Sequence, residues 1–107
     1  VYVLTDNVLA SAIPTLISVT EEAKLPVICA EGGMVRAGGL ASLGVDYYQP
    51  GFQTGVMAAD ILSGKAKPAD MAIQAQKEFK PTINLKEAAK IGLKVPEDLL
   101  KGADVIK

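Results

Sequence analysis

The sequence predicts an α/β fold built on a parallel sheet. Residues 1–4 are a short apolar run of strand-favouring residues, and after the turn Thr5-Asp6-Asn7 the apolar residues change to helical spacing. A second apolar run, residues 27–30, follows that helical stretch. A strand, a helix and a strand of these lengths form a βαβ unit, whose two strands are parallel and whose crossover is right-handed.

The first helical segment carries an apolar stripe that contains a proline. The stripe is formed by Leu9, Ala12, Ile13, Leu16, Ile17 and Ala23. Because proline lacks a backbone N–H, two readings stay open. Either one helix is kinked at Pro14, or a short first turn ends near Ala12 and a second helix begins with Pro14 in its first turn.

The next segments predict a strand, a loop, a strand and a helix. The run 27–30 does not alternate, so we expect a strand buried on both faces, and the glycines of Glu31-Gly32-Gly33 predict a loop after it. A third strand is expected over residues 40–48, with residues 49–51 as a break. A helix whose face includes Phe52, Val56, Ala59 and Leu62 should end near Ser63-Gly64.

The C-terminal part predicts shorter elements. Two strand-like pieces are expected around residues 71–74 and 79–83. Asn84, with Glu87 three residues later, is a capping-box pattern for a helix over 85–91. Residues 95–100 predict a last short helix. The chain begins inside a predicted strand, so we expect that residues preceding Val1, with any export signal, are absent.

Composition argues against several classes of function. The 107 residues include 11 Lys and Arg and 12 Asp and Glu, for a net charge of -1, and the two signs do not collect into blocks. This argues against nucleic acid or an anionic membrane as the main partner. The apolar stretches are too short to cross a bilayer.

Catalytic and metal-binding patterns are missing from the sequence. It has no histidine and one cysteine, Cys29, which excludes an internal disulfide and a cysteine-based zinc site. Cys29 lacks a histidine partner, so we expect a small buried residue rather than a nucleophile. No Gly-x-Ser-x-Gly motif, phosphate loop or dinucleotide fingerprint is present. We therefore expect a protein that is not an enzyme and has no cofactor or metal.

Polar segments follow the three predicted strands. They are Thr5-Asp6-Asn7, Glu31-Gly32-Gly33 and the stretch from Asp46 to Gln49. In an open parallel sheet, ligands bind at the carboxyl ends of the strands. Asp6 or Asn7 is expected to cap the following helix, which is compatible with binding. Glu31 is either solvated at the rim or directed at a donor such as an amino group, and we favour the second.

Tyr47 and Tyr48 are adjacent at the predicted end of the third strand. If both belong to a strand, their side chains point to opposite faces. One is then expected in core or hinge packing, and the other can line a cleft; alternation does not decide which.

Several separated motifs resemble one protein family. They are Thr5-Asp6-Asn7, Leu25-Pro26-Val27, residues 31–35, residues 41–48, Gly51 and Gly55 with Met57-Ala58-Ala59, Ile83-Asn84-Leu85 and Val95-Pro96-Glu97. Together they resemble the tryptophan/tyrosine-type family of ABC-transporter substrate-binding proteins over essentially the whole chain. The resemblance implies a type I periplasmic-binding-protein fold, in which two Rossmann-like lobes close around a ligand. The chain is similar to the C-terminal third of such a protein, and its lobe would be incomplete.

The resemblance implies how the chain divides between the lobes. Residues 1–46 would belong to the C-terminal lobe, and residues 47–70 would form a hinge segment and a crossover helix of the N-terminal lobe. Residues 71–107 would supply return strands and C-terminal helices. Because the rest of the N-terminal lobe is not in this chain, we expect the crossover helix to be exposed and the isolated piece to repack or form a homo-oligomer through it.

The resemblance also implies a site and a function. The residues that would contact the ligand are Thr5, Asp6, Asn7, Glu31, Gly32, Tyr48 and Gln49. An ammonium group would suit Asp6 or Glu31. The protein would be the solute-binding component of an ABC importer, in the periplasm or lipid-anchored outside the cytoplasmic membrane, and would deliver a small amino-acid-like ligand to permease subunits. The alternative is a ligand-binding sensory domain of a receptor or signalling protein.

Overall fold

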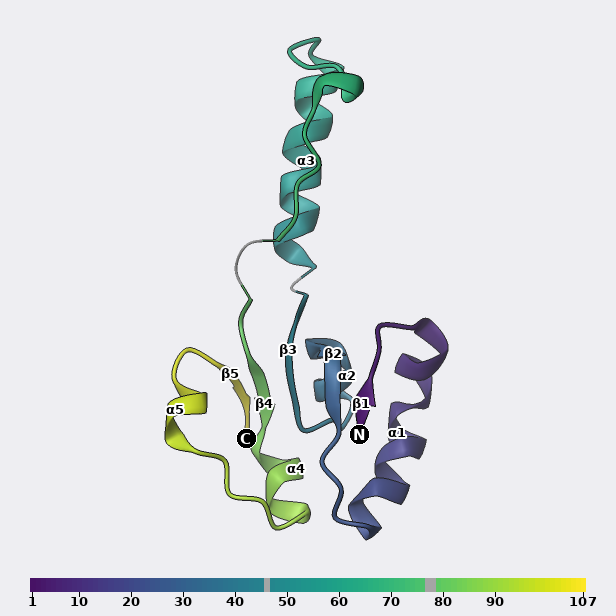
Figure 1. Ribbon diagram of the computed structural model, residues 1–107, viewed down its shortest axis with the longest axis vertical. Coiled ribbons are helices and arrows are strands. Elements are labelled where there is room, and N and C mark those ends of the chain that lie inside the picture. The colour runs from purple at the N-terminus through teal and green to yellow at the C-terminus, as the bar shows by residue number, and fades with distance from the viewer. Residues whose placement is uncertain (46, 77–78) are drawn as a thin grey trace. The chain divides into compact units, whose positions relative to one another are not determined.

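The computed structural model describes residues 1–45, 47–76 and 79–107, and the chain divides into two compact units. Unit 1 comprises residues 1–45 and 79–107, and unit 2 comprises residues 46–78. Unit 1 contains a sheet with helices, whereas unit 2 contains one long helix, α3 (Tyr48–Leu62), and a 3-10 turn, Pro68–Asp70 (Figure 1). The assignment of these units to two lobes of a longer protein stays a prediction.

The sheet of unit 1 confirms the predicted α/β fold with a mainly parallel sheet. Its strands are β1 (Tyr2–Val3), β2 (Ile28–Glu31), β3 (Ala41–Val45), β4 (Thr82–Asn84) and β5 (Asp104–Ile106). They are ordered β1-β2-β3-β4-β5, and every neighbouring pair is parallel except the antiparallel pair β3 and β4. The sequence did not predict β5, because three residues after a glycine turn give too short a pattern.

Four helices accompany this sheet. They are α1 (Asn7–Glu22), α2 (Gly32–Arg36), α4 (Leu85–Lys90) and α5 (Glu97–Leu100). α1 is one continuous helix with Pro14 inside it, so the reading with two separate helices is wrong. Pro14 is exposed, and its ring lies away from the buried residues Ile13 and Ile17.

One face of the sheet packs against α1 and α2. Val3 of β1 pairs with Cys29 of β2, and Cys29 pairs with Ser42 of β3, so the three side chains lie on the same face. Around Val3 and Cys29, the buried core continues through Ile13, Ile17, Val27, Met34 and Val35. A smaller cluster of Leu40, Ala88 and Ile91 attaches α4 to the start of β3.

The other face of the sheet keeps apolar side chains exposed. Tyr2 and Ile28 are paired neighbours on this face, and they are 64% and 38% exposed, whereas Cys29 on the opposite face is 1% exposed. The expectation that the second strand is buried on both faces is therefore wrong for this chain. The physical reason is that α1 and α2 contribute their buried side chains to the Cys29 face.

Two predicted breaks are helical in the structure. The third strand ends at Val45, and α3 begins at Tyr48, so residues 49–51 lie in its first turn. Pro50 is tolerated there because the first turn of a helix does not need its N–H. The expected loop at Glu31-Gly32-Gly33 is instead the junction of β2 with α2. Asp46, part of the predicted third strand, lies outside the described residues.

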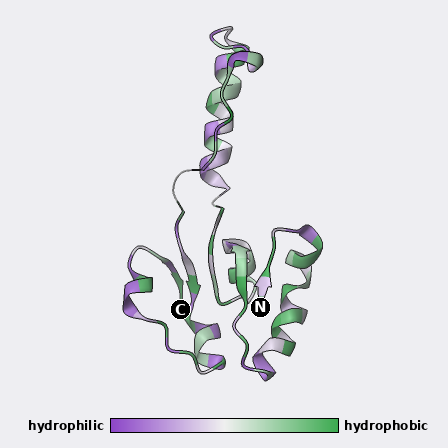
Figure 2. Ribbon diagram, in the orientation of Figure 1, coloured by the Kyte–Doolittle hydropathy of each residue, from purple (hydrophilic) through white to green (hydrophobic). Residues whose placement is uncertain are grey.

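The remaining segments agree with the sequence in part. α3 ends at Leu62 as predicted, whereas the piece expected at residues 71–74 is not a strand. None of the residues of α3 is buried, and its apolar side chains Phe52, Val56 and Leu62 are exposed. Figure 2 shows hydrophobic and hydrophilic residues alternating along this helix. Self-association through it stays a prediction.

Candidate ligand-binding site

The parallel strands of unit 1 bring two of the predicted polar segments to one edge of the sheet. β1, β2 and β3 run in the same direction, so their carboxyl ends meet at that edge. The turn Thr5-Asp6-Asn7 follows β1, and Glu31, the last residue of β2, is paired with Val45 at the end of β3. The edge therefore combines two carboxylates with a hydroxyl and an amide.

Asp6 is the N-cap of α1. Its Oδ1 accepts hydrogen bonds from the backbone N–H of Val8 at 2.8 Å and of Leu9 at 2.9 Å. These are two of the donors that the first turn of a helix leaves without partners. The predicted capping role is confirmed for Asp6. In the part of the chain that the structure describes, no hydrogen bond is made by its second oxygen, Oδ2, and the residue is exposed, so Oδ2 can accept from another donor.

Thr5 and Asn7 present unused polar groups beside Asp6. Both residues are exposed, and within the described part of the chain neither side chain makes a hydrogen bond. Only the backbone carbonyl of Asn7 is engaged, by the hydroxyl of Ser11 at 2.8 Å. The turn thus offers a hydroxyl, a carboxylate oxygen and an amide without first breaking a protein contact.

Glu31 caps the next helix, α2. Its Oε2 accepts from the N–H of Gly33 and its Oε1 from the N–H of Met34, each at 2.8 Å. A carboxylate has about four lone-pair positions, so both oxygens can still accept from a further donor. The sequence missed this role because a helix of five residues, two of them glycine, has no helical pattern. A Cβ at Gly33 would lie 2.8 Å from Glu31 Oε2, so the absence of a side chain there leaves room for the cap.

Gly32 lies in unit 1, whereas the two hinge-side candidates, Tyr48 and Gln49, lie in unit 2. Gly32 is half-buried at the start of α2, and a Cβ there would lie 3.0 Å from Thr82 Oγ1 of β4. Tyr48 and Gln49 are exposed residues of α3 in unit 2. The expectation that Tyr47 and Tyr48 alternate along a strand is wrong, because Tyr48 is the first helical residue and Tyr47 precedes it as N-cap.

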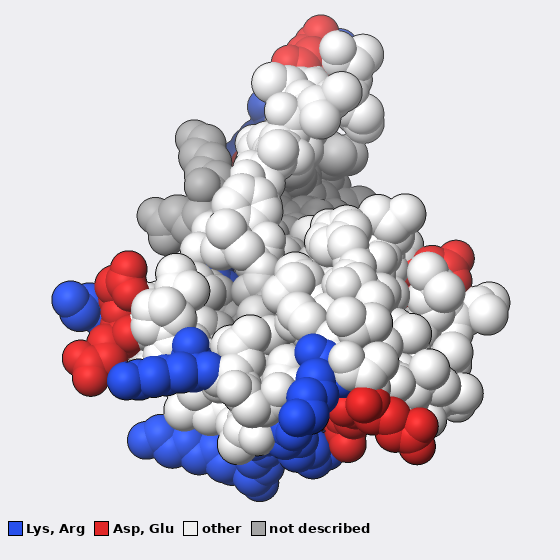
Figure 3. All heavy atoms as spheres, turned by 60° about the horizontal axis from the view of Figure 1, so that its bottom comes forward, with Lys and Arg blue, Asp and Glu red and all other residues white. Residues whose placement is uncertain are grey.

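A metal-ligand cluster and the cysteine thiol are two features that could give the described residues a reactive group. No group of three or more His, Cys, Asp or Glu side chains there could hold a metal ion. Cys29 is buried, and burial together with the charge of Glu31 raises the pKa of its thiol to about 11. A thiol that stays protonated is a poor nucleophile. Figure 3 shows Lys and Arg side chains adjoining Asp and Glu side chains on the face that it presents.

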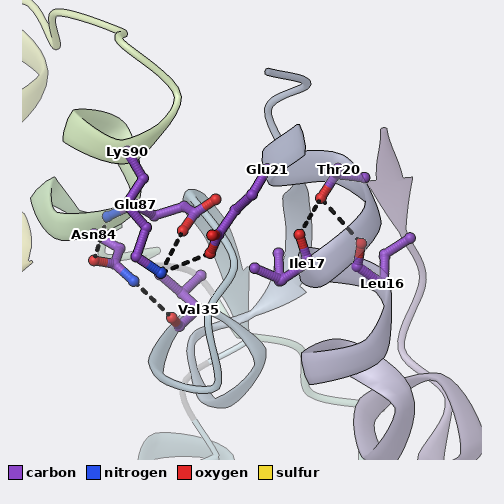
Figure 4. A network of polar contacts seen from close by, with 8 residues as sticks. All are labelled: Leu16, Ile17, Thr20, Glu21, Val35, Asn84, Glu87 and Lys90. Carbon is purple, nitrogen blue, oxygen red and sulfur yellow. Dashed lines mark hydrogen bonds and ion pairs between the residues drawn. The ribbon is translucent and has the colours of Figure 1, made fainter. Parts of the chain in front are cut away.

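The sequence also missed a polar network that involves α4. The capping box was half right, since Asn84 Oδ1 accepts from the N–H of Glu87 at 3.1 Å. The return bond of the motif is not made, because the N–H of Asn84 already donates to Leu40 O at 2.8 Å. The carboxylate of Glu87 lies instead beside Lys90 (Figure 4). Its burial between helices distant in sequence leaves no local sequence signal.

Comparison with known proteins identifies the family of this chain. The family model described as ABC transporter substrate binding protein matches residues 1–107. The chain belongs to that family. Among curated relatives of this family member, the tyrosine-binding protein of Clostridioides difficile (strain R20291) is 35% identical over 106 residues, which is 99% of this chain and 27% of the relative.

Two solved structures match the fold of this family member. A conserved domain protein from Vibrio cholerae has a TM-score of 0.86 and 40% identity. An ABC domain from Streptococcus pneumoniae, solved in complex with L-Trp, has a TM-score of 0.85 and 38% identity. Each match covers 99% of this chain and 36% of the solved chain. No helix in the described residues is long and apolar enough to span a membrane.

Proposed function

We propose that this chain supplies one wall of the binding site of an amino-acid-binding component of an ABC importer. The observation that carries the proposal is the polar edge formed by Thr5, Asp6, Asn7 and Glu31. An amino acid carries an ammonium group, and that group is well matched by an unused carboxylate oxygen with neighbouring hydrogen-bonding groups. The L-Trp complex of one structural relative and the name of the tyrosine-binding relative support this class of ligand.

Each residue of the proposed site has its own role in binding. Asp6 accepts from the ammonium group through Oδ2 while Oδ1 keeps α1 capped, so the charge that binds is held in place by the helix. Thr5 and Asn7 add a hydroxyl and an amide, which can bind the ligand without first breaking a hydrogen bond within the described residues. Glu31 adds negative potential, and Gly32 lets the ligand approach the backbone. Tyr48 and Gln49 make contacts from the hinge side.

The rest of the proposal concerns the whole protein. The chain spans about a third of the length of the solved relatives, so the opposite wall comes from an N-terminal lobe. Enclosure between the two lobes, rather than any chemical step, retains the ligand. The protein works outside the cytoplasmic membrane, either in the periplasm or lipid-anchored, and passes the ligand to permease subunits.

The experiment is a calorimetric titration of the full-length protein with the twenty common amino acids, beginning with tyrosine and tryptophan. Asp6→Asn keeps an N-cap oxygen but removes the charge, and should weaken binding by roughly tenfold or more, since hydrogen bonds to charged groups contribute about 1.5–3 kcal/mol. Asp6→Ser is the matched control for the cap and should weaken binding at least as much. Failure of the wild-type protein to bind any amino acid would refute the proposal. Unchanged affinity in both variants would remove Asp6 from the site.

A further inference from the structure

Two glutamates and a lysine meet where α4 lies beside the end of α1 (Figure 4). Lys90 Nζ is 2.6 Å from Oε1 of Glu21, which lies in the last turn of α1, and 3.6 Å from Oε2 of Glu87, one turn before Lys90 on α4. The side chain of Glu87 is 2% exposed, whereas that of Glu21 is 30% exposed. A carboxylate as buried as that of Glu87 is costly unless its charge is compensated.

The charges of this group do not balance when both glutamates are ionised. Among the described residues, the charged groups that act on Glu87 are Glu21 from α1 and Lys90 from α4 itself. α2 contributes an uncharged carbonyl, that of Val35, which accepts from the amide Nδ2 of Asn84 at 3.3 Å. Two carboxylates facing one ammonium leave one negative charge in excess. One bound proton removes that excess.

The same residues join the two chain segments that form unit 1. Glu21 belongs to the segment before unit 2, and Glu87 and Lys90 belong to the segment after it. Within the described residues, β3 and β4 pair at Ala41 with Ile83 and at Ser42 with Thr82. Side-chain contacts add to this pairing, among them Lys90 of α4 with Glu21 and Asp104 of β5 with Arg36.

We propose that Glu21, Glu87 and Lys90 form a proton-dependent clasp, which holds α4 and the segment 79–107 against the first segment of unit 1 most tightly when one of the two carboxylates is protonated. Glu87 takes that proton. Its neutral carboxyl group can donate to Glu21, and Lys90 then pairs with Glu21 alone. The clasp does not depend on the ligand or on the proposed function.

The directions of the pKa shifts agree with this order of protonation. Burial, and then the neighbouring Glu21 carboxylate, raise the pKa of Glu87. The hydrogen bond from Lys90 lowers the pKa of Glu21. A raised pKa in the folded state means that the stabilisation is present at low pH and is lost as the pH rises through it, whereas a lowered pKa gives the opposite loss on acidification. The clasp should thus be tightest in an interval around the ordinary glutamate pKa of about 4.3.

The test is a carboxyl ¹³C NMR titration of the full-length protein, with hydrogen exchange of the Ile91 amide, which donates to Glu87 O. Glu87 should titrate above the ordinary glutamate pKa of about 4.3, and Glu21 below it. Glu22, an exposed neighbour of Glu21, is the matched control position. The protection factor of Ile91 should fall as the pH rises through the pKa of Glu87, by up to about tenfold for each unit by which that pKa is raised.

Three variants complete the test. Glu87→Gln imitates the protonated state and should abolish the fall in protection toward neutral pH, whereas Glu22→Gln should leave it unchanged. Glu21→Gln removes the competing carboxylate and should lower the titration midpoint of Glu87. The clasp is refuted if Glu87 titrates at or below the ordinary glutamate pKa of about 4.3 in the wild-type protein, a result that needs no variant to fold. It is equally refuted if Glu87→Gln keeps the wild-type exchange profile.

Discussion

Replacing Gly44 by alanine should damage the sheet, because β3 carries an irregularity at this residue. From Cys29 to Glu31, β2 advances two residues, whereas the paired residues of β3, Ser42 and Val45, are three apart. The extra residue is therefore in β3, as in a β-bulge. A Cβ at Gly44 would lie 1.8 Å from the backbone O of Ala30 and 2.7 Å from Ser42 Oγ.

The expected loss of stability depends on which atoms would have to move to make room for the new Cβ. Real Cβ atoms essentially never approach other heavy atoms within 3.0 Å, so β2 and β3 would have to separate by more than an ångström at their centre. The obstacle is backbone, so no side-chain rotation relieves it. Overpacking that side chains can relieve costs about 1–3 kcal/mol, and we expect the loss for Gly44→Ala to be at least about 3 kcal/mol.

The assay is chemical denaturation of the 107-residue chain, at a concentration where it does not associate, followed by circular dichroism, with Gly55→Ala as the matched control. Gly55 lies in α3, and a Cβ there would meet nothing within 4 Å. Alanine should therefore stabilise that helix by about 1 kcal/mol. Opposite signs for the same substitution at the two sites are the expected result. A Gly44→Ala protein within about 0.5 kcal/mol of wild type would refute the reasoning, since that is the range of neutral surface changes.

Three further predictions concern the core, the thiol and the isolated chain. Ile13→Ala should cost about 2–5 kcal/mol in a denaturation experiment, because Ile13 is fully buried, whereas Ala12→Ser at an exposed position of the same helix should change little. Cys29 should react with a thiol reagent at pH 8 only after unfolding, and rapid labelling of the native protein would contradict this prediction. Because the pKa of its thiol is raised in the folded state, the free energy of unfolding should fall as the pH rises from about 9 to about 11. The 107-residue chain alone should bind an apolar dye and associate at high concentration through its exposed apolar residues in light scattering, and it should bind amino acids far more weakly than the full-length protein in calorimetry.

The sequence predicted the elements that have local signals. Short apolar runs identified β1 and β2, helical spacing identified α1, and Asp6 or Asn7 was expected as an N-cap because these residue types satisfy the first N–H groups of a helix. Parallel pairing then placed the turn after β1 and Glu31 on one edge. The wrong prediction of a break after the third strand also came from a local signal. Pro50 and Gly51 favour a break by residue type, but both are acceptable in the first turn of a helix.

Features created by distant contacts could not be predicted in this way. The burial of Glu87 depends on α1 lying beside α4, and the exposure of Ile28 depends on which face the helices cover. The role of Glu31 was only partly predictable, because a glutamate at the end of a strand can either cap the following helix or face a ligand, and the residue type does not distinguish the two. In the structure both of its carboxylate oxygens accept from backbone N–H groups of α2.

The two-segment construction of unit 1 has a consequence for the order of folding. When residues 1–45 leave the ribosome, β3 has an unpaired edge that only β4 can complete, and β4 is made after all of unit 2. Contacts between residues so far apart in the sequence first cost the conformational entropy of closing a long loop, and only then contribute to stability. The sheet of the first segment therefore keeps an open edge at β3 until β4 has been made and pairs with it.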